Sequence, residues 1–219
     1  MQVHVVTAAN RECYKTELIQ FFHERHRIYV QEKGWRDDDG SGFEIDQFDT
    51  DHATYLIGIE DDRVMSGTRL IPTTSPHLAS EVFPHLCNFS GVLRSPTVAE
   101  WTRGFISTEF RERGIGPIKG QFCSAVMDFC LQEGITQVGG IQELYWLRLW
   151  KRFGWHVDPI GTPAKIDGKW CVVAYMRVNE AARNGAMASG GISQSILVRC
   201  GPQQPFVISV AAEGKTHAA

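Results

Sequence analysis

TVAEWTRGFIS (residues 97–107) is followed by FRERGIG (110–116) and then by a mostly apolar segment that ends at Gly134. The first run predicts a β-strand. Apolar side chains of the last segment recur at the spacing of one helical face; they are Ile115, Ile118, Phe122, Val126 and Phe129. This periodicity predicts an amphipathic helix over 115–133, and glycine is the residue that most often follows a helix end. The chain therefore contains a strand, a glycine-containing loop and a helix in succession.

The loop has the pattern Arg111-x-x-Gly114-x-Gly116. Glycines let a backbone approach a ligand closely, and free N–H groups at the start of a helix bind phosphate. A coenzyme A pyrophosphate fits such a loop, with Arg111 or Arg113 as its charge partner. The pattern resembles the pyrophosphate loop of the GCN5-related N-acetyltransferase superfamily. Any turn from a strand to a helix can also carry two glycines, so a purely structural role stays open.

Upstream of this unit the sequence predicts a strand, a helical region and a hairpin. QVHVV (2–6) reads as a short strand, and apolar residues recur at helical spacing over 10–32. The acidic, glycine-rich stretch 36–52 predicts a long loop, of a length that is usually functional or disordered. ATYLIGIE (53–60) and RVMSGTRLIPT (63–73), separated by two aspartates, predict a β-hairpin.

Four prolines make residues 72–96 irregular, with a short helix expected near 78–86. Downstream we expect a strand at 136–142, a helix at 143–153 and final strands at 155–161 and 169–178. Beyond Asn179 the composition turns to Ala, Gly, Ser and Gln. We therefore predict one domain over 1–178 and a weakly ordered C-terminal extension over 179–219, with one strand-like run, SILVRC (195–200).

Hairpin strands come first and alternating strands and helices later, which implies a mixed sheet flanked by helices in an α/β (α+β) domain. The resemblance of the loop implies the acetyltransferase-like version of this fold. In that fold, helices cover both faces and a central cleft opens where the middle strands splay.

Composition excludes several classes of function. The net charge is −3 and the pI is about 6.2, so the basic excess of nucleic-acid-binding proteins is missing. No apolar run reaches the length of a membrane span, and the N-terminus lacks a secretory signal. The six scattered cysteines form no CxxC pair, which predicts reduced thiols and no metal site. We expect a cytoplasmic protein that contacts neither nucleic acid nor membrane.

A second pattern lies in RHRIYVQEKGW (25–35), EIDQFD (44–49), GTRLIPT (67–73) and EWTR (100–103). Its charged and aromatic members are Arg25, Tyr29, Trp35, Asp46, Asp49, Arg69, Glu100 and Arg103. In order and spacing this set resembles the acyl-homoserine lactone synthase family, and the resemblance covers roughly residues 5–175. The family pattern has Phe where this chain has Tyr29 and Ser where it has Thr102, and both exchanges keep the size of the side chain.

Arg69 lies in an otherwise apolar strand and must be paired if it is buried. Asp46 and Asp49 are its natural partners. A structural ion pair and direct binding of S-adenosylmethionine both remain open, and the two roles overlap, because a network that orders the loop also builds the pocket. The aspartates could also be ordinary turn residues, and Trp35 could cap a small core.

The resemblance implies that the α-amine of S-adenosylmethionine is acylated from a thioester and that the product then closes to a lactone, releasing methylthioadenosine. It assigns the S-adenosylmethionine pocket and its network to Arg25, Tyr29, Trp35, Asp46, Asp49, Arg69 and Phe105. Trp35 offers the sulfonium a cation–π face. Both compounds are substrates, so no separate cofactor is expected.

We expect Glu100 to take the amine proton, directly or through water, and Arg103 or backbone N–H groups to meet the oxyanion. The α-amine has a reference pKa of ~7.7–8.0, so a modest base suffices. Residues 100 and 103 would point to opposite faces of a regular strand. Acetyltransferase-like folds carry a bulge in this strand, which would bring the two residues together.

The acyl side falls in VGGIQELYWLRLWKRFGW (138–155). Gly140 stands where synthases of 3-oxo-acyl products in the family commonly have a hydroxyl residue, which disfavours such substrates here. Bulky side chains of Trp101, Tyr145, Trp146 and Trp150 would shorten a pocket and favour a branched or aromatic acyl group. Each of these aromatic residues could instead belong to the ordinary core.

The acyl carrier is the least determined point. An acyl carrier protein would need a basic patch, for which Arg148, Lys151, Arg152 and Lys119 are candidates. The loop at 111–116 and the aromatic pocket favour acyl-CoA. EIDQFDT, PTTSP and EVFPHL also resemble the rhizobial-type branch of the family, which uses branched-chain or aryl CoA thioesters. The competing functions are another GCN5-like N-acyltransferase and a non-catalytic acyl-CoA-binding sensor.

Overall fold

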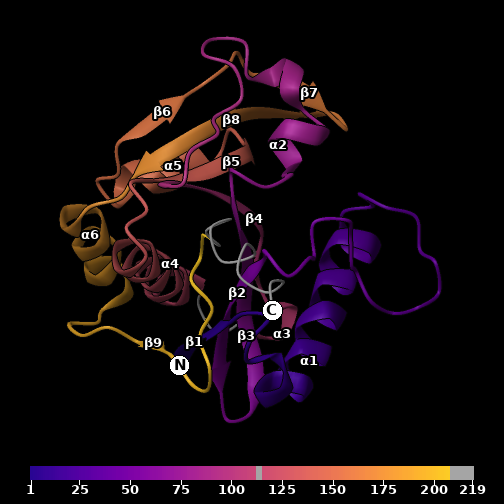
Figure 1. Ribbon diagram of the computed structural model, residues 1–219, viewed down its shortest axis with the longest axis vertical. Helices are drawn as coiled ribbons and strands as arrows, with labels where there is room; N and C mark the ends of the chain where they lie inside the picture. The colour runs from indigo at the N-terminus through magenta and orange to yellow at the C-terminus, as the bar shows by residue number, and fades with distance from the viewer. Residues whose placement is uncertain (112–114, 208–219) are drawn as a thin grey trace, which may run out of the picture.

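Within residues 1–111 and 115–207, which the computed structural model describes, one mixed sheet runs through the whole fold (Figure 1). Its strand order is β6-β8-β5-β4-β3-β2-β1-β9, and β7 pairs with β8 beside this path. The strands are β1 (Gln2–Val6), β2 (Thr54–Glu60), β3 (Arg63–Pro72), β4 (Val98–Ile106), β5 (Gln137–Glu143), β6 (Val157–Pro159), β7 (Ala164–Ile166), β8 (Lys169–Arg177) and β9 (Leu197–Val198). Neighbours are antiparallel except for the pairs β4–β5 and β1–β9. The predicted mixed sheet is confirmed; β7 was not foreseen.

Helices cover both faces of the sheet. They are η1 (Arg11–Tyr14), α1 (Lys15–Arg25), η2 (His26–Glu32), α2 (Leu78–Glu81), η3 (Pro84–Leu86), α3 (Thr108–Arg111), α4 (Ile115–Gln132), α5 (Trp146–Arg152) and α6 (Glu180–Gly190). In Figure 1, α4 and α6 lie on one side of the central strands and α1 on the other. Strand alternation explains this: Leu56 and Leu70 pack in the core under α4, whereas Tyr55 and Ile57 pack under α1.

The predicted hairpin and helix ends have clear local causes. Asp61 and Asp62 both have positive φ, 49° and 58°, the conformation that a two-residue hairpin turn between β2 and β3 requires. Gly134 has φ 69° and follows the end of α4, where Ile135 N–H donates to the carbonyl of Cys130 at 2.8 Å. The helical region expected over 10–32 is also present, but its last seven residues form the π-helix η2.

Part of the C-terminal extension, which was expected to be weakly ordered, forms a helix that was not foreseen. The Asn179 side chain accepts the N–H of Ala182 and starts α6, which packs closely along α4. A Cβ on Gly120 would lie 2.3 Å from the nitrogen of Gly190, so these two helices approach through glycines. Small residues were read as a sign of weak order, but in a helix they permit this close packing. Phe206 is also buried, against Phe129.

β9 is the counterpart of the strand-like run expected at 195–200, and it is only two residues long. It pairs in parallel with β1 and so extends the sheet by one strand. Over the described residues, we find no helix that is both long and apolar enough to cross a membrane.

Candidate active site

A cavity opens where β4 and β5 separate. The two strands pair only from Val98 to Glu100, opposite Gln137 to Gly139, and no longer pair beyond these residues. The predicted splay is therefore confirmed. The cavity has a volume of about 440 Å³ and is lined from η2, β4, β5, α4 and α5.

Three arginines and three acids, all with side chains at most 10% exposed, form a network next to this cavity. Arg25 donates to Glu44 at 2.6 Å and to Asp49 at 2.8 and 2.9 Å. Arg69 donates to both oxygens of Asp46, at 2.6 and 3.1 Å, and lies 2.8 Å from Asp49. The side chains of Arg25 and Arg69 are fully buried. The predicted pairing of Arg69 with the two loop aspartates is thus confirmed.

Arg103 is the third arginine of the network. It donates to Glu44 at 3.0–3.2 Å and to Asp46 at 3.0 Å. Glu44 is 1% exposed and had not been picked out in the sequence. A charge count would have found it: three arginines that must be paired need a third acid, and Glu44 lies two residues from Asp46 in the same acidic loop.

The network sets the pKa values of its acids. Burial alone would raise the pKa of Asp49, but the charge of Arg25 and its two hydrogen bonds hold that pKa well below the usual range. Burial also favours a higher pKa for Asp46, but the hydrogen bond from Arg69 lowers that pKa below its usual value. Both aspartates are therefore anions at neutral pH.

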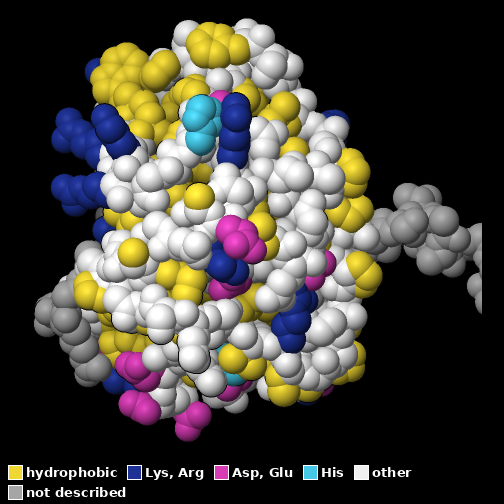
Figure 2. Space-filling view, turned by 90° about the vertical axis from the view of Figure 1, so that its left-hand side faces the viewer, with side chains coloured by type: hydrophobic (Ala, Val, Ile, Leu, Met, Phe, Trp, Pro, Cys, Tyr) yellow, Lys and Arg dark blue, Asp and Glu magenta, His cyan; other side chains and the backbone are white. Residues whose placement is uncertain are grey.

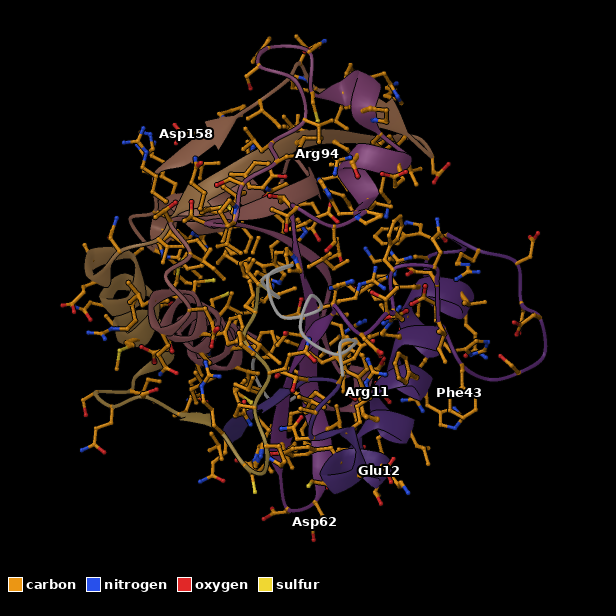
Figure 3. All side chains as sticks on the ribbon, in the orientation of Figure 1. Arg11, Glu12, Phe43, Asp62, Arg94 and Asp158 are labelled. Carbon is orange, nitrogen blue, oxygen red and sulfur yellow. The ribbon has the colours of Figure 1, made fainter. Side chains whose placement is uncertain are left out.

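The loop over 33–53 brings the acids to the sheet. It lies beside α1 on the right of Figure 1. Phe43, labelled in Figure 3, packs against His23 of α1 with ring centroids 4.2 Å apart. At its start, Trp35 stacks on Tyr29 at 4.9 Å. The Arg103 guanidinium lies 5.2 Å from the Tyr29 ring centroid and 5.8 Å from that of Trp35. The hydroxyl of Tyr29 donates to the carbonyl of Gly104 at 2.7 Å. Tyr29, Trp35 and Arg103 all line the cavity.

A bulge in β4 sets the orientation of the Arg103 side chain. Gly67 pairs with Phe105 and Arg69 with Thr102, a separation of two residues in β3 against three in β4, so β4 holds one extra residue. Arg103 has φ 55°, which a strand residue does not normally adopt. The expected bulge is confirmed, and it turns Arg103 toward Glu44 and Asp46. Phe105 lines the cavity and packs on Phe21 at 5.5 Å.

Glu100 is placed differently from the other predicted residues. Its side chain is fully buried, and it is not among the described residues that line the cavity. Its oxygens accept the N–H groups of Leu78 and Ala79, at 2.8 and 2.7 Å, at the start of α2. Burial, its largest influence, raises the pKa of Glu100. Glu100 therefore lies one layer behind the cavity wall, where it anchors α2.

Aromatic side chains form the other half of the cavity. Trp146 stacks on Trp150 at 5.5 Å, and Trp150 stacks on Trp155 at 4.9 Å. Trp101 packs against Trp150 at 5.6 Å, and Tyr145 against Trp146 at 5.0 Å. Trp101, Tyr145, Trp146 and Trp150 all line the cavity, although Trp150 is also deep in the core. Lining the cavity and packing in or against the core therefore occur together here, and a role in binding the acyl group stays a prediction.

Of the glycines predicted to lie at the acyl or CoA site, Gly116 and Gly140 are within the described residues. Gly140 lines the cavity with φ 151°, and a Cβ there would lie 3.1 Å from Cγ of Glu100, so a larger residue would be strained. Gly116 lies in the first turn of α4, where a Cβ would meet nothing within 4 Å. Arg111 lines the cavity, but Glu32 pairs with it at 2.7 Å. Arg113 and Gly114 lie outside the described residues.

The basic side chains considered for a carrier protein lie mainly on α5. Arg148, Lys151 and Arg152 are exposed, while Lys119 of α4 lines the cavity with its amine 5.3 Å from the Trp146 ring centroid. Figure 2 shows Lys and Arg side chains gathered at one edge of the face that it views.

The chain is similar in sequence and in fold to known proteins. The family model described as autoinducer synthase matches residues 9–185. An isovaleryl-homoserine lactone synthase of Bradyrhizobium diazoefficiens is 40% identical over 175 residues, which cover 78% of each chain. A solved CoA-dependent acyl-homoserine lactone synthase, BjaI, with SAM and isopentyl-CoA, superimposes with a TM-score of 0.86 at 35% identity, over 94% of this chain and 96% of that one.

The acetyltransferase-like fold is also confirmed. An N-acetyltransferase structure from Lactobacillus plantarum superimposes with a TM-score of 0.54 at 19% identity, over 82% of this chain and all of that chain. At this identity the likeness concerns the fold alone.

Proposed function

The chain belongs to the autoinducer synthase family and is an acyl-homoserine-lactone synthase, and we propose that it acylates S-adenosylmethionine from a branched-chain or aryl acyl-CoA. The observation that carries this proposal is a single cavity with two unlike halves. One half has the charged and aromatic set Tyr29, Trp35 and Arg103, and the other has the tryptophans around Trp146. We place S-adenosylmethionine in the first half and the acyl group in the second.

Two bond exchanges complete the reaction. The ammonium group first loses one proton to a base. The α-amine nitrogen then attacks the thioester carbon, a C–N bond forms and the C–S bond breaks. A second proton passes from the nitrogen to the sulfur, which leaves as the CoA thiol, and the amide keeps one N–H. The methionine carboxylate oxygen then attacks the carbon next to the sulfonium. A C–O bond forms, and methylthioadenosine leaves as a neutral thioether. The second step needs no base, because the nucleophile is already an anion.

Several features support the roles given to individual residues. The Trp35 ring, 39% exposed, offers a cation–π surface to the sulfonium. Arg103 is the network arginine that lines the cavity, so we assign it to the substrate carboxylate or the developing oxyanion. Arg25, Asp46, Asp49 and Arg69 hold the loop and Arg103 in place. We further propose that the reaction takes place in the cytoplasm, in keeping with the six cysteines, none of which forms a disulfide in the described structure.

The acyl half supports a compact, non-oxidised acyl group. Gly140 offers no side-chain donor to a 3-oxo group. Gln142 also lines the cavity, but its amide is already engaged, since it accepts from Trp150 at 2.5 Å and donates to the carbonyl of Ala174 at 3.1 Å. A 3-oxo group would therefore lose a hydrogen bond to water without gaining one from these residues.

The first experiment compares acyl donors. We expect kcat/KM to be highest for isovaleryl-CoA or an aryl-CoA, lower for octanoyl-CoA, and lowest for octanoyl carrier protein. Product formation is measured by mass spectrometry of acyl-homoserine lactone and methylthioadenosine. If the carrier-protein substrate is preferred about tenfold or more, a difference of ~1.4 kcal/mol, the donor proposal is wrong. Preference for octanoyl on both carriers would reject the compact pocket.

The second experiment enlarges the pocket. Trp146→Ala removes a ring that stacks on Trp150, so we expect kcat/KM to shift toward longer acyl chains in a graded way, since each methylene in a pocket is worth ~1–3 kcal/mol. Trp170→Ala is the matched control, because Trp170 is 53% exposed and is not part of the cavity lining. An unchanged chain-length profile in Trp146→Ala would remove Trp146 from the acyl pocket.

A further inference from the structure

Glu100 is not the only polar group buried behind the cavity wall. Glu100 of β4 pairs with Gly139 of β5, and Gly139 pairs with Tyr175 of β8. Residues paired across strands point to the same face of a sheet. Glu100 and Tyr175 therefore share one face, and the residue between them has no side chain.

Two atoms beside Glu100 lack hydrogen-bond partners among the described residues. They are the Tyr175 hydroxyl oxygen and Nε2 of His77. Both residues are fully buried. His77 immediately precedes α2, and Glu100 accepts hydrogen bonds from the first N–H groups of that helix. Nδ1 of His77 lies 2.8 Å from the carbonyl oxygen of Ser75. That contact requires a proton on Nδ1, because a carbonyl oxygen only accepts, and Nε2 has no partner among the described residues.

Buried polar atoms in native proteins are almost always satisfied, and an enclosed water that makes about three hydrogen bonds is the common solution. A water between Tyr175, His77 and Glu100 would satisfy both unpartnered atoms and one free lone pair of the carboxylate. The other groups that act on Glu100 are the thiol of Cys87, beyond η3, and the guanidinium of Arg69 on β3.

We propose that His77 and Tyr175 are positioning residues that hold a water against Glu100 and set the pH at which this carboxyl exchanges protons with the bound amine. The inference rests on the proposed function for its catalytic consequence. A short route to the cavity supports it: Gly140 and Leu78 both line the cavity, a Cβ on Gly140 would lie 3.1 Å from Cγ of Glu100, and the N–H of Leu78 donates to the same carboxylate.

The test removes only the Tyr175 hydroxyl. In Tyr175→Phe, the proposed water that donates to Glu100 loses one of its holders. The anion of Glu100 is then less stabilised, so its pKa should rise and the acid limb of the kcat profile should move up by roughly half a pH unit or more. KM for both substrates should stay within about twofold, since no cavity-lining group is changed. Tyr14→Phe is the matched control, because the Tyr14 hydroxyl contacts His4, outside the active site.

His77 is tested with a pair of variants. His77→Asn keeps a donor near the position of Nδ1 but removes Nε2, whereas His77→Gln places an amide near the position of Nε2. We expect the Gln variant to recover more of the wild-type pH profile than the Asn variant. Equal profiles for both, matching the wild type, would argue against His77.

A measurement that requires no catalysis distinguishes a failure of this inference from a failure of the proposed function. The pH titration of the Glu100 carboxyl is followed by infrared difference spectra between the wild type and Glu100→Gln, and again in the Tyr175→Phe background. An upward shift supports the inference even if no acyl-CoA is turned over, in which case the proposed function alone fails. An unshifted carboxyl titration together with an unshifted kcat profile overturns the inference.

Discussion

Replacing Asp49 with alanine is expected to nearly abolish turnover and to lower the free energy of unfolding by roughly 3–5 kcal/mol, the usual cost of breaking a buried ion pair. Asp49 accepts hydrogen bonds from Arg25, from the N–H of Asp46 and from the hydroxyl of Tyr55, and lies 2.8 Å from Arg69. Without it, two fully buried guanidinium groups lose a counter-charge. The loop that carries Glu44 and Asp46 would then no longer hold Arg103.

Two further variants make this prediction specific. Asp49→Asn keeps the shape but not the charge and should be almost as damaging. Asp51→Ala, which removes an exposed partner of Arg11, should change stability by less than about 1 kcal/mol. Denaturant unfolding and calorimetry of S-adenosylmethionine binding are the measurements. Kinetics and stability close to wild type in Asp49→Ala would refute the network.

The network also predicts an acid dependence of stability. The folded pKa of Asp49 lies below the unfolded value of 3.8, so its contribution is fully present above that value. It is lost as the pH falls through the folded pKa. Because Asp49→Asn removes this titration, its unfolding free energy should fall less steeply with acid than that of the wild type.

Replacing Glu100 with glutamine is expected to lower kcat by ~10²–10⁴-fold, the range for loss of a general base. The structure supplies a second reason for a loss of rate. Glutamine has one acceptor oxygen, so its NH₂ group would face an N–H of Leu78 or Ala79 and loosen the start of α2. The substrate KM values should change much less than kcat.

The pH dependence distinguishes the two reasons. If Glu100 accepts the amine proton, raising the pH should partly rescue kcat in Glu100→Gln, because the free amine then loses its proton to solvent. A defect of the same size at every pH would assign Glu100 only the anchoring of α2. Glu81→Gln is the control, since the Glu81 side chain is 47% exposed at the other end of the same helix.

Patterns that depend on neighbouring residues or on charge pairing could be predicted from the sequence. The strand–loop–helix unit, the β2–β3 hairpin and the pairing of Arg69 with Asp46 and Asp49 all follow from periodicity or from the cost of an unpaired buried charge. The bulge in β4 was expected only from the resemblance to acetyltransferase-like folds, and no residue of the sequence signals it. It was confirmed by the register of β3 against β4.

Features set by tertiary packing could not be predicted. No local signal distinguishes the π-helix His26–Glu32 from an α-helix, because the difference is one hydrogen-bond register. The burial of Glu100 depends on where α2 settles, and α2 is only four residues long. Helix α6 was missed because its buried face, Ala182, Ala186, Met187 and Gly190, consists mostly of small residues, which gain their stability from close contact with α4.

The short pairing of β9 with β1 has a consequence for truncation. β1 carries Val3, Val5 and Val6, and without β9 its unpaired N–H and C=O groups would form an open strand edge, the usual template for sheet-to-sheet aggregation. A chain cut at residue 185, where the family match ends, would leave that edge bare while every residue of the ion network remained. The cut would also remove the second half of α6 and Phe206, so α4 would lose part of its packing. We expect such a chain to self-associate through exchanged strands.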